Sequence, residues 1–232
     1  MNKEIAVVLT SGGMDSALCT GIALKEGYEI AALHLNYKQR TESKELKTFK
    51  VLTEYYHINS KLVVNVEHLS LIGGSSLTDK NISIEMADLS RKEIPQSYVP
   101  FRNANILSIA VSWAEVIGAN AIYIGATQAD GSGYSDCRKE FFDAFQEAIN
   151  IGTKPETRIK IITPLINLTK KDIVILGTDL NIPFHLTWSC YQEDEIACGV
   201  CDSCALRLRG FQQAGIEDQI PYKIKPNYLS GC

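Results

Sequence analysis

The sequence predicts an α/β fold, an open and mostly parallel doubly wound sheet with helices on both faces. Three observations lead to this prediction. Short apolar runs rich in Val and Ile alternate with segments of helical period along the 232 residues, which is the pattern of repeated strand–helix–strand units. The first apolar run is followed at once by a glycine turn and a helical pattern. Most polar motifs come directly after a predicted strand, where open parallel sheets bind their ligands.

The predicted elements follow this alternation along the chain. Residues 5–10 are a buried strand, and from Asp15 the apolar residues share one helical face. Residues 68–100 contain a glycine pair and two prolines with weak periodicity, so we expect a loop-rich insertion there. Thr169 opens a later helix with Asp172 in its first turn. The other strands are predicted at 29–37, 61–66, 121–125 and 159–162, and the other helices at 42–56, 103–117 and 139–151, with a short helix from 205.

Length and charge limit the kinds of protein this chain can be. We expect one α/β domain over residues 1–185 and a smaller C-terminal segment over 186–232 packed on it. The net charge of −4 and the pI near 5.6 argue against a sequence-blind nucleic-acid binder, which needs a basic face. The most apolar stretch, residues 106–126, contains Glu115 and Asn120 and falls short of a membrane span. No leader pattern precedes the first strand, so we expect a cytoplasmic protein.

The turn Ser11-Gly12-Gly13-Met14-Asp15-Ser16 is the first candidate site. Backbone N–H groups at a glycine turn that opens a helix form a cradle for an anion such as phosphate. Neither G-x-x-x-x-G-K-[ST] nor G-x-G-x-x-G occurs here. The acid in the turn repels a phosphate unless a cation such as Mg²⁺ lies between them. In the alternative interpretation, Asp15 is only a first-turn acid and Ser11 a helix cap.

Three further motifs follow predicted strands or open a predicted helix. Residues 36–40 hold a Tyr that can stack on a flat ring and a Gln and an Arg that can bind polar edges, although a solvated loop explains them too. Arg102 lies at a helix start, where a bound anion or a salt bridge would explain a cation. Residues 125–138 are more polar than a turn requires. Cys137 lacks a nearby His in sequence and is expected to be a plain thiol, and His34 a core residue.

Four of the seven cysteines fall within residues 190–204. This spacing fits a reducing compartment and a metal site better than a disulfide framework. A closed tetrahedral zinc site is the preferred interpretation, ahead of an iron–sulfur cluster and of a redox C-x-x-C pair. The expected ligands are Cys190, Cys198, Cys201 and Cys204.

The hexapeptide S-G-G-x-D-S resembles the pyrophosphate-binding loop (PP-loop) of the ATP pyrophosphatase family, whose members cleave ATP between the α and β phosphates and share an adenine nucleotide alpha-hydrolase-like fold. A narrower resemblance rests on six motifs in one order over residues 10–211. They are S-G-G-x-D-S, N-Y-x-Q-R, V-P-F-R-N, S-G-Y-x-D-C-R, T-W-S-C-Y and C-G-V-C-D-S-C-x-L-R-L-R-G-F. Together they are similar to the 7-cyano-7-deazaguanine synthase family of queuosine biosynthesis.

This resemblance implies a carbon–nitrogen ligase. It implies that ATP adenylates the carboxylate of 7-carboxy-7-deazaguanine, that ammonia captures it as an amide, and that a second ATP activates the amide to leave the nitrile. It also implies Mg²⁺, a structural Zn²⁺ on the four cysteines, a homodimer, and neither nucleic acid nor membrane as a partner.

The resemblance also assigns residues to roles. It places ATP and Mg²⁺ at Thr10, Ser11, Gly12, Gly13, Met14, Asp15, Ser16, Ala17 and Leu18. It places the substrate at Tyr37, Gln39, Arg40, Arg102, Asn103, Tyr134, Asp136 and Arg138. The expected catalytic residues are Asp15, Ser16, Arg102 and Arg138. Of these groups, the two tyrosines would stack on the purine-like ring, the arginines would bind carboxylate or phosphate, and Asp136 would accept guanine-like N–H groups.

The chain departs from the family pattern at two positions. Ser135 stands where the family has Pro, and Thr41 where it has His. These departures leave open a related ligase that stops at the amide or passes the acid to another amine. Two other classes also stay open: a tRNA-modifying member of the ATP pyrophosphatase family, and a nucleotide-binding zinc module without catalysis.

Overall fold

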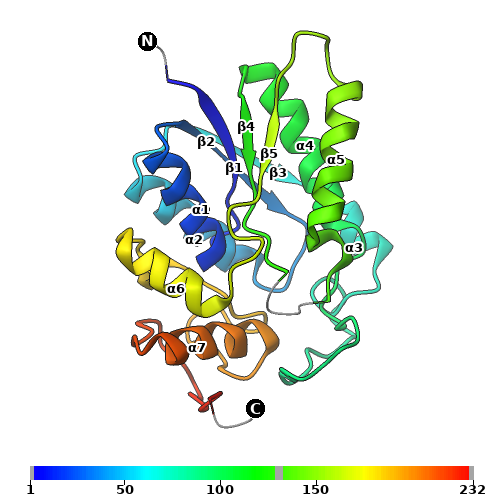
Figure 1. Ribbon diagram of the computed structural model, residues 1–232. Coiled ribbons are helices and arrows are strands. Elements are labelled where there is room, and N and C mark those ends of the chain that lie inside the picture. The colour runs from blue at the N-terminus through cyan, green and yellow to red at the C-terminus, as the bar shows by residue number, and fades with distance from the viewer. Residues whose placement is uncertain (1–2, 129–132, 230–232) are drawn as a thin grey trace.

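The computed structural model describes residues 3–128 and 133–229. A five-stranded sheet, parallel throughout, forms its centre, with the strands in the order β3-β2-β1-β4-β5 (Figure 1). The strands are β1 (Ile5–Leu9), β2 (Glu29–Asn36), β3 (Ser60–Asn65), β4 (Ala121–Tyr123) and β5 (Lys160–Ile162). The predicted α/β fold with a parallel, doubly wound sheet is therefore confirmed.

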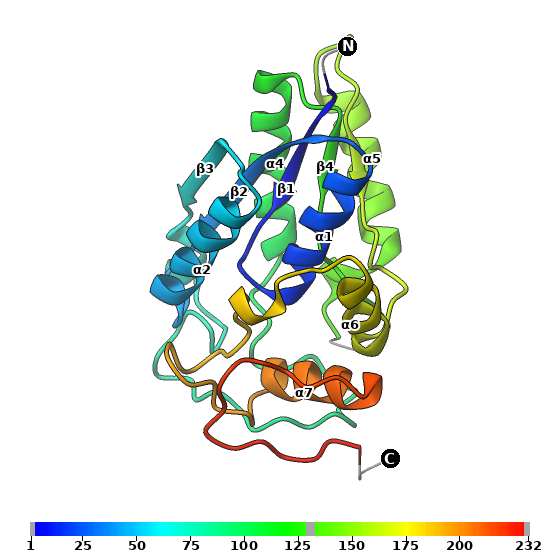
Figure 2. The ribbon, with the colours of Figure 1, turned by 90° about the vertical axis from the view of Figure 1, so that its left-hand side faces the viewer.

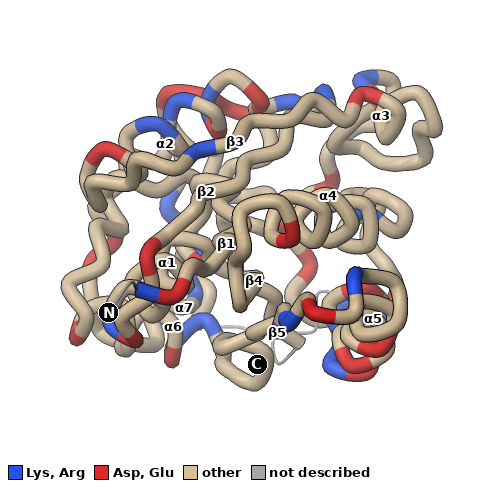
Figure 3. The backbone as a smooth tube through the Cα atoms, turned by 90° about the horizontal axis from the view of Figure 1, so that it is seen from above, with Lys and Arg blue, Asp and Glu red and all other residues tan. Residues whose placement is uncertain are grey.

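The helices cover both faces of this sheet. The order of the strands reverses direction at β1, and right-handed crossovers then place the helices of the two halves on opposite faces. Accordingly, α1 and α2 lie to one side of the sheet and α4 and α5 to the other when the protein is seen from above (Figure 3). The helices are α1 (Met14–Lys25), α2 (Glu42–Tyr55), α3 (His68–Ile72), α4 (Arg102–Ile117), α5 (Lys139–Gly152), α6 (Lys170–Asp179) and α7 (Asp202–Ala214).

Two apolar cores result, one on each face of the sheet. Along β1, Val7 packs into the core shared with α4 and α5, whereas Ala6 and Val8 pack into the core under α1 and α2. Because both faces of β1 are covered, the strand is apolar at every position instead of alternating. Burial on both faces therefore explains the uninterrupted apolar run that the sequence shows at residues 5–9.

The sequence predicted the boundaries of the elements to within a few residues. Thr169 caps α6 as expected: its hydroxyl accepts from the N–H of Asp172 at 3.2 Å, and the Asp172 carboxylate accepts from the N–H of Thr169 at 3.0 Å. The C-terminal helix begins at Asp202, earlier than the predicted start at residue 205. The chain enters the helix at Cys201 rather than after Cys204, the last of the four clustered cysteines.

The segment 68–100 contains one short helix, α3, and otherwise turns and bends. Two arginines fasten it to the rest of the protein. Arg40 donates to the backbone carbonyls of Ser76, Asp79 and Ile82 at 2.7, 3.1 and 2.6 Å. Arg91 forms an ion pair of 3.0 Å with Asp202 at the start of α7. The segment is loop-rich, as the sequence predicts, and it is held by specific contacts.

The C-terminal residues 186–229 lie across the carboxyl ends of the strands, with α7 beneath α6 (Figure 2). The two helices touch at Gly210, where an added Cβ would lie 2.7 Å from Cβ of Lys170. The domain division at residue 185 stays a prediction. Within the described ranges, no helix has the length and apolar character needed to cross a membrane. Cys232 and residues 129–132 of the polar loop at 125–138 lie outside the described residues.

Candidate functional site

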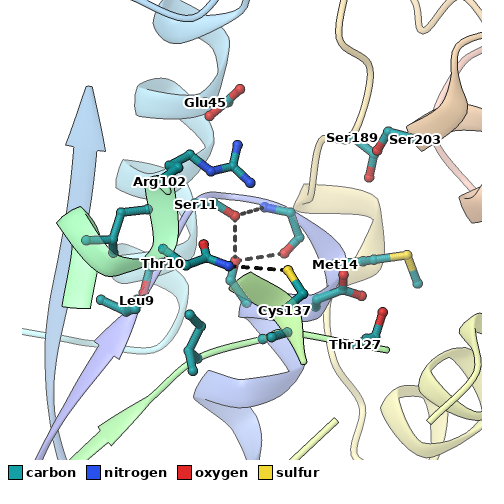
Figure 4. Close-up of a pocket in the computed structure, with 18 of the residues that line it drawn as sticks. Leu9, Thr10, Ser11, Met14, Glu45, Arg102, Thr127, Cys137, Ser189 and Ser203 are labelled. Carbon is teal, nitrogen blue, oxygen red and sulfur yellow. Dashed lines mark hydrogen bonds between the residues drawn. The ribbon is translucent and has the colours of Figure 1, made fainter. Parts of the chain in front are cut away.

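A cavity of about 310 Å³ opens at the carboxyl ends of β1, β2 and β4 (Figure 4). This is the point where the strand order reverses and where open α/β sheets leave a crevice. The glycine turn after β1, the end of β2, the start of α4 and the loop after β4 all contribute to its lining, as do α6 and the chain around Cys190. The motifs predicted to converge at this edge of the sheet do so.

The turn at residues 11–16 is held by its own hydroxyl groups. Gly13 donates its N–H to Oγ of Ser11 at 3.2 Å, and Ser16 donates its hydroxyl to the Gly13 carbonyl at 2.9 Å. The residue that caps α1 is Gly13, without a side-chain hydrogen bond, so Ser11 is not the helix cap. The N-terminus of α1 thus presents backbone N–H groups to the cavity, which suits an anion.

Glycines let this turn pack tightly between its neighbours. Gly12 has a φ of +92°, and an added Cβ would lie 3.1 Å from the side chain of Thr48 on α2. On the opposite side, an added Cβ at Gly125 would lie 3.0 to 3.1 Å from the backbone of Asp15. A side chain at either position would push the turn out of place, so the cradle is preorganised.

Asp15 and Lys170 form the charged centre of the cavity. The Lys170 ammonium donates to Oδ2 of Asp15 at 2.6 Å, and both side chains are mostly buried. The other carboxylate oxygen, Oδ1, is buried and has no hydrogen-bond partner among the described residues. A buried, unpartnered carboxylate oxygen beside an anion cradle is a donor that fits a divalent cation such as Mg²⁺.

Lys170 did not emerge from the sequence analysis. Its signal is nevertheless present, because it is the first residue of α6 and a cation there opposes the helix dipole. The same argument singled out Arg102 at the start of α4. Applied to every predicted helix, it would have found both residues.

The other part of the cavity is aromatic. Arg102 donates to the hydroxyl of Tyr37 at 3.1 Å, and its guanidinium lies 5.7 Å from the centre of that ring. Burial raises the pKa of Tyr37 to about 12, so the phenol is neutral at physiological pH. Tyr134 shares a hydrogen bond of 2.8 Å with Ser97 from the 68–100 segment. Asn103 also reaches the cavity, where its amide donates to Sγ of Cys137 at 3.2 Å.

The remaining predicted substrate residues lie outside this lining. Gln39 accepts from the N–H of Tyr37 at 2.8 Å, and Arg40 binds the carbonyls of the 68–100 segment. Asp136 is buried and accepts from the N–H of Asn103 at 2.9 Å, so it holds the start of α4. Arg138 is exposed at the start of α5. Of the predicted nucleotide residues, Thr10, Ser11, Gly13, Met14, Asp15 and Ser16 line the cavity, whereas Gly12, Ala17 and Leu18 shape or support the turn from behind.

Two other groups of the cavity bear on its chemistry. Burial raises the pKa of the Cys137 thiol to about 11, so this residue is a thiol rather than a thiolate nucleophile at physiological pH. Glu45, on α2, lines the cavity and was not predicted by the sequence. Its carboxylate accepts from Thr41 and Gln39, each at 2.9 Å.

The four cysteines Cys190, Cys198, Cys201 and Cys204 form a second site next to the cavity. They are buried, and their sulfur atoms all lie within 4.8 Å of one another. Sγ of Cys198 accepts from the backbone N–H groups of Val200 and Cys201, at 3.4 and 3.3 Å, which favours a thiolate. When four sulfur atoms bind one zinc ion tetrahedrally with Zn–S bonds of ~2.3 Å, neighbouring sulfur atoms lie about 3.8 Å apart. The Sγ atoms of Cys198 and Cys204 are 3.8 Å apart.

The cysteine site is connected to the glycine turn at residues 11–16 through Trp188. The backbone N–H of Trp188 donates to the carbonyl of Gly12 at 2.9 Å. Its indole ring lies under the ammonium of Lys44, 4.1 Å from the ring centre. Two residues further on, Cys190 is the first of the four clustered cysteines and also lines the cavity.

Comparison with known proteins gives a consistent result. The family model described as queuosine biosynthesis protein QueC matches residues 5–215. A relative from Chloroherpeton thalassium, named 7-cyano-7-deazaguanine synthase, is 62% identical over 97% of this chain and 99% of its own length. Relatives of the same name from Chlorobaculum tepidum and Chlorobium phaeobacteroides are 58% and 57% identical over the same shares of the chains.

Proposed function

The chain belongs to the family of queuosine biosynthesis protein QueC and is an ATP-dependent ligase of queuosine biosynthesis. From this premise we propose how its cavity carries out the reaction. The substrates are 7-carboxy-7-deazaguanine, ammonia and ATP, and the product is 7-cyano-7-deazaguanine. The observation that carries the proposal is the Asp15–Lys170 pair beside the uncapped N-terminus of α1, inside a cavity large enough for small substrates.

The reaction requires a carboxylate to become an electrophile. A carboxylate oxygen attacks the α-phosphorus of ATP and pyrophosphate leaves. Ammonia then attacks the carbonyl carbon and loses a proton, and AMP departs to leave the amide. The amide oxygen then attacks the α-phosphorus of a second ATP and pyrophosphate leaves again. Loss of AMP together with the two protons on nitrogen leaves the nitrile. The protein's part is to hold the reactants and neutralise charge, since a covalent nucleophile is not needed.

The charged end of the cavity suits the nucleotide. The turn at Ser11, Gly13 and Ser16 would hold pyrophosphate with its N–H and hydroxyl groups. Lys170 would neutralise charge that develops on the phosphates. Asp15 would hold Mg²⁺ through its unpartnered oxygen, and the ion would supply further neutralisation of the phosphate oxygens.

The aromatic end suits the flat substrate. Tyr37 and Tyr134 line this end and would stack on the substrate ring. Arg102, which is hydrogen-bonded to Tyr37, would offer its guanidinium to the substrate carboxylate. Three predicted site residues do not line the cavity and would support the loops around it: Arg40, Asp136 and Arg138. In this proposal the catalytic groups are Asp15, Ser16, Lys170 and Arg102.

Zinc is the metal that we propose for the four cysteines. The sulfur spacing fits one tetrahedral ion, whereas an iron–sulfur cluster places several iron atoms between the sulfurs and holds them farther apart. All four positions would be filled by protein ligands, so the ion would stabilise the fold without taking part in the reaction. A homodimer and a place in the cytoplasm are proposed from the family resemblance alone, and sedimentation analysis tests the first.

Incubation of purified protein with Mg-ATP, ammonium and 7-carboxy-7-deazaguanine, followed by mass spectrometry, tests the proposed reaction. We expect the nitrile with two AMP for each nitrile formed. Accumulation of the amide would instead show that the chain with Thr41 and Ser135 stops after the first activation. If neither AMP nor a changed substrate appears with folded, zinc-loaded protein, the substrate assignment is wrong.

A further inference from the structure

The cavity contains an acid that the reaction proposed above does not use. Among the described residues, Asp15 and Glu45 are the acids that line the cavity. Asp15 pairs with Lys170, whereas Glu45 comes from α2 and lies near Arg102 (Figure 4). The two carboxylates therefore have different partners: Asp15 binds Lys170, and Glu45 binds Thr41 and Gln39.

Glu45 is fixed in one orientation. Oε1 accepts from the hydroxyl of Thr41 and Oε2 from the side-chain amide of Gln39, both at 2.9 Å. Gln39 is itself buried and is anchored by the N–H of Tyr37, which donates to its oxygen at 2.8 Å. These hydrogen bonds connect the backbone just after β2 to the carboxylate of Glu45. The Glu45 side chain therefore has little freedom to rotate.

This carboxylate has acceptor capacity to spare. A carboxylate offers about four lone-pair positions, and the two internal donors occupy one on each oxygen. Burial raises the pKa of Glu45, while hydrogen bonds from Gln39 and Thr41 and the charge of Arg102 act against this rise. A partly buried carboxylate that lines a cavity gains most from a ligand that brings two N–H donors.

We propose that Glu45 is the specificity-determining residue for the substrate's amino-pyrimidinone edge and accepts hydrogen bonds from its ring N–H and exocyclic amino group. This inference rests on the proposed function. A guanine-type ring carries two adjacent N–H donors that match the two oxygens of one carboxylate, whereas a ring without the amino group carries one. The role expected from the sequence for Asp136 passes to Glu45, because Asp136 is occupied by the start of α4.

Thr41 has a place in this arrangement. It stands where the family pattern has His, and its hydroxyl supplies one of the two bonds that orient Glu45. It is a positioning residue: replacement by Val should weaken binding of the acid in the same direction as a change at Glu45, by a smaller factor, and leave nucleotide binding alone.

Equilibrium binding to the unmodified protein tests the inference first. Calorimetry compares 7-carboxy-7-deazaguanine with the analogue that lacks the exocyclic amino group, at saturating non-hydrolysable ATP and Mg²⁺. We expect the guanine-type acid to bind about 100-fold or more tightly, since a site built for hydrogen bonding rejects a ligand that leaves it unpaired. Equal binding of the two acids overturns the role of Glu45 without any need for a variant.

Glu45→Gln then identifies the residue, with Glu42→Gln as the matched control one turn earlier on α2. Glu42 accepts from the N–H of Lys38 at 2.7 Å and does not line the cavity. Glu45→Gln should reduce the discrimination between the two acids to less than about 10-fold, with unchanged nucleotide affinity. Glu42→Gln should discriminate as the unmodified protein does.

Three outcomes distinguish the possibilities. If Glu45→Gln keeps the full preference for the guanine-type acid, the inference is wrong while the proposed reaction stands. If it weakens binding of ATP instead, Glu45 belongs to the nucleotide site and the inference is again wrong. If the unmodified protein binds neither acid and forms no AMP from them, the proposed function itself fails, and the inference fails with it.

Discussion

At the scale of single residues, the chemistry of the cavity depends on where charges are balanced. Lys170 lies 2.6 Å from Asp15, so each offsets the charge of the other in a mostly buried place. The unpartnered oxygen of Asp15 and the N–H groups of α1 remain available to a bound phosphate and its cation. In the proposed function, the pair would receive ligands of both signs.

Replacement of Lys170 tests this arrangement. Lys170→Ala should lower kcat/KM by roughly 100- to 1,000-fold, the range found when one preorganised group that stabilises developing charge is removed. Lys170→Arg should recover part of the rate because the positive charge is kept. Steady-state release of AMP measures both variants. A Lys170→Ala protein with normal turnover would remove this residue from the catalytic machinery.

His34 gives a second prediction at the scale of one residue. The ring is fully buried against Phe49, with Nδ1 at 2.9 Å from the carbonyl of Thr10 and Nε2 without a partner among the described residues. Burial lowers the pKa of His34 below its usual value of 6.5, although the bond to Thr10 and contacts with Asn36 and Glu42 act against this. The imidazole is therefore neutral in the folded protein.

The stability of the protein should consequently fall in acid. Below pH 6.5 the unfolded chain binds a proton at this histidine more readily than the folded protein does, so unfolding is favoured as the pH falls toward the lowered pKa. The contribution cannot exceed about 1.4 kcal/mol per pH unit for one proton. Urea unfolding at pH 7.5 and 5.5 should show a larger drop for the unmodified protein than for His34→Phe. Equal drops would show that another group causes the acid sensitivity.

At the scale of secondary-structure elements, the contact of α6 with α7 determines where Lys170 lies. Gly210 on α7 meets the first residue of α6 with no space for a side chain: an added Cβ would lie 2.9 Å from the backbone carbonyl group of Lys170. Backbone cannot move aside as a flexible side chain can. A larger residue must separate the helices and carry the ammonium away from Asp15.

Gly210→Ala should therefore destabilise the protein by about 1–3 kcal/mol, as overpacking does, and lower kcat/KM. Gly152→Ala is the matched control, because Gly152 ends α5 and an added Cβ there meets nothing within 4 Å. The control should be neutral or slightly stabilising, since alanine restricts the unfolded chain. Thermal unfolding and AMP release measured on both variants decide whether the close contact matters.

At the scale of the whole molecule, the cysteine site is connected to the glycine turn that we propose as the phosphate site. Arg207 on α7 is buried and donates to Asp218 and Thr187, each at 2.7 Å. Thr187 precedes Trp188, whose N–H holds the carbonyl of Gly12. A change in the four cysteines can thus reach the glycine turn through α7, Arg207 and the chain from Thr187 to Trp188.

Loss of the metal should accordingly weaken nucleotide binding. Cys204 does not line the cavity, so Cys204→Ser removes a proposed zinc ligand without touching the nucleotide. We expect loss of about one zinc per chain, measured by metal analysis, and weaker binding of non-hydrolysable ATP. By thermodynamic linkage, bound nucleotide should tighten zinc binding by the same factor, so the unmodified protein should keep more zinc at equilibrium with a competing chelator. Unchanged nucleotide affinity in a folded, zinc-free protein would contradict this coupling.

The sequence by itself determined the sheet, its parallel direction, the position of the glycine turn before α1 and the grouping of the four cysteines. These features are local, because strand and helix periods, turn glycines and ligand spacing are all expressed within a few residues. Even the capping of α6 by Thr169 could be predicted from its neighbour three residues on.

Only the tertiary structure decided which polar side chains face the cavity. Asp136 and Arg40 resemble ligand-binding residues in the sequence, yet one holds the start of α4 and the other binds carbonyls of the 68–100 segment. Glu45 looks like an ordinary helix residue, and Lys170 stands out only as a cation at a helix start, yet both line the cavity. The direction of a side chain depends on contacts between segments far apart in the chain, such as the 155 residues that separate Lys170 from Asp15. Local patterns carry no record of those contacts.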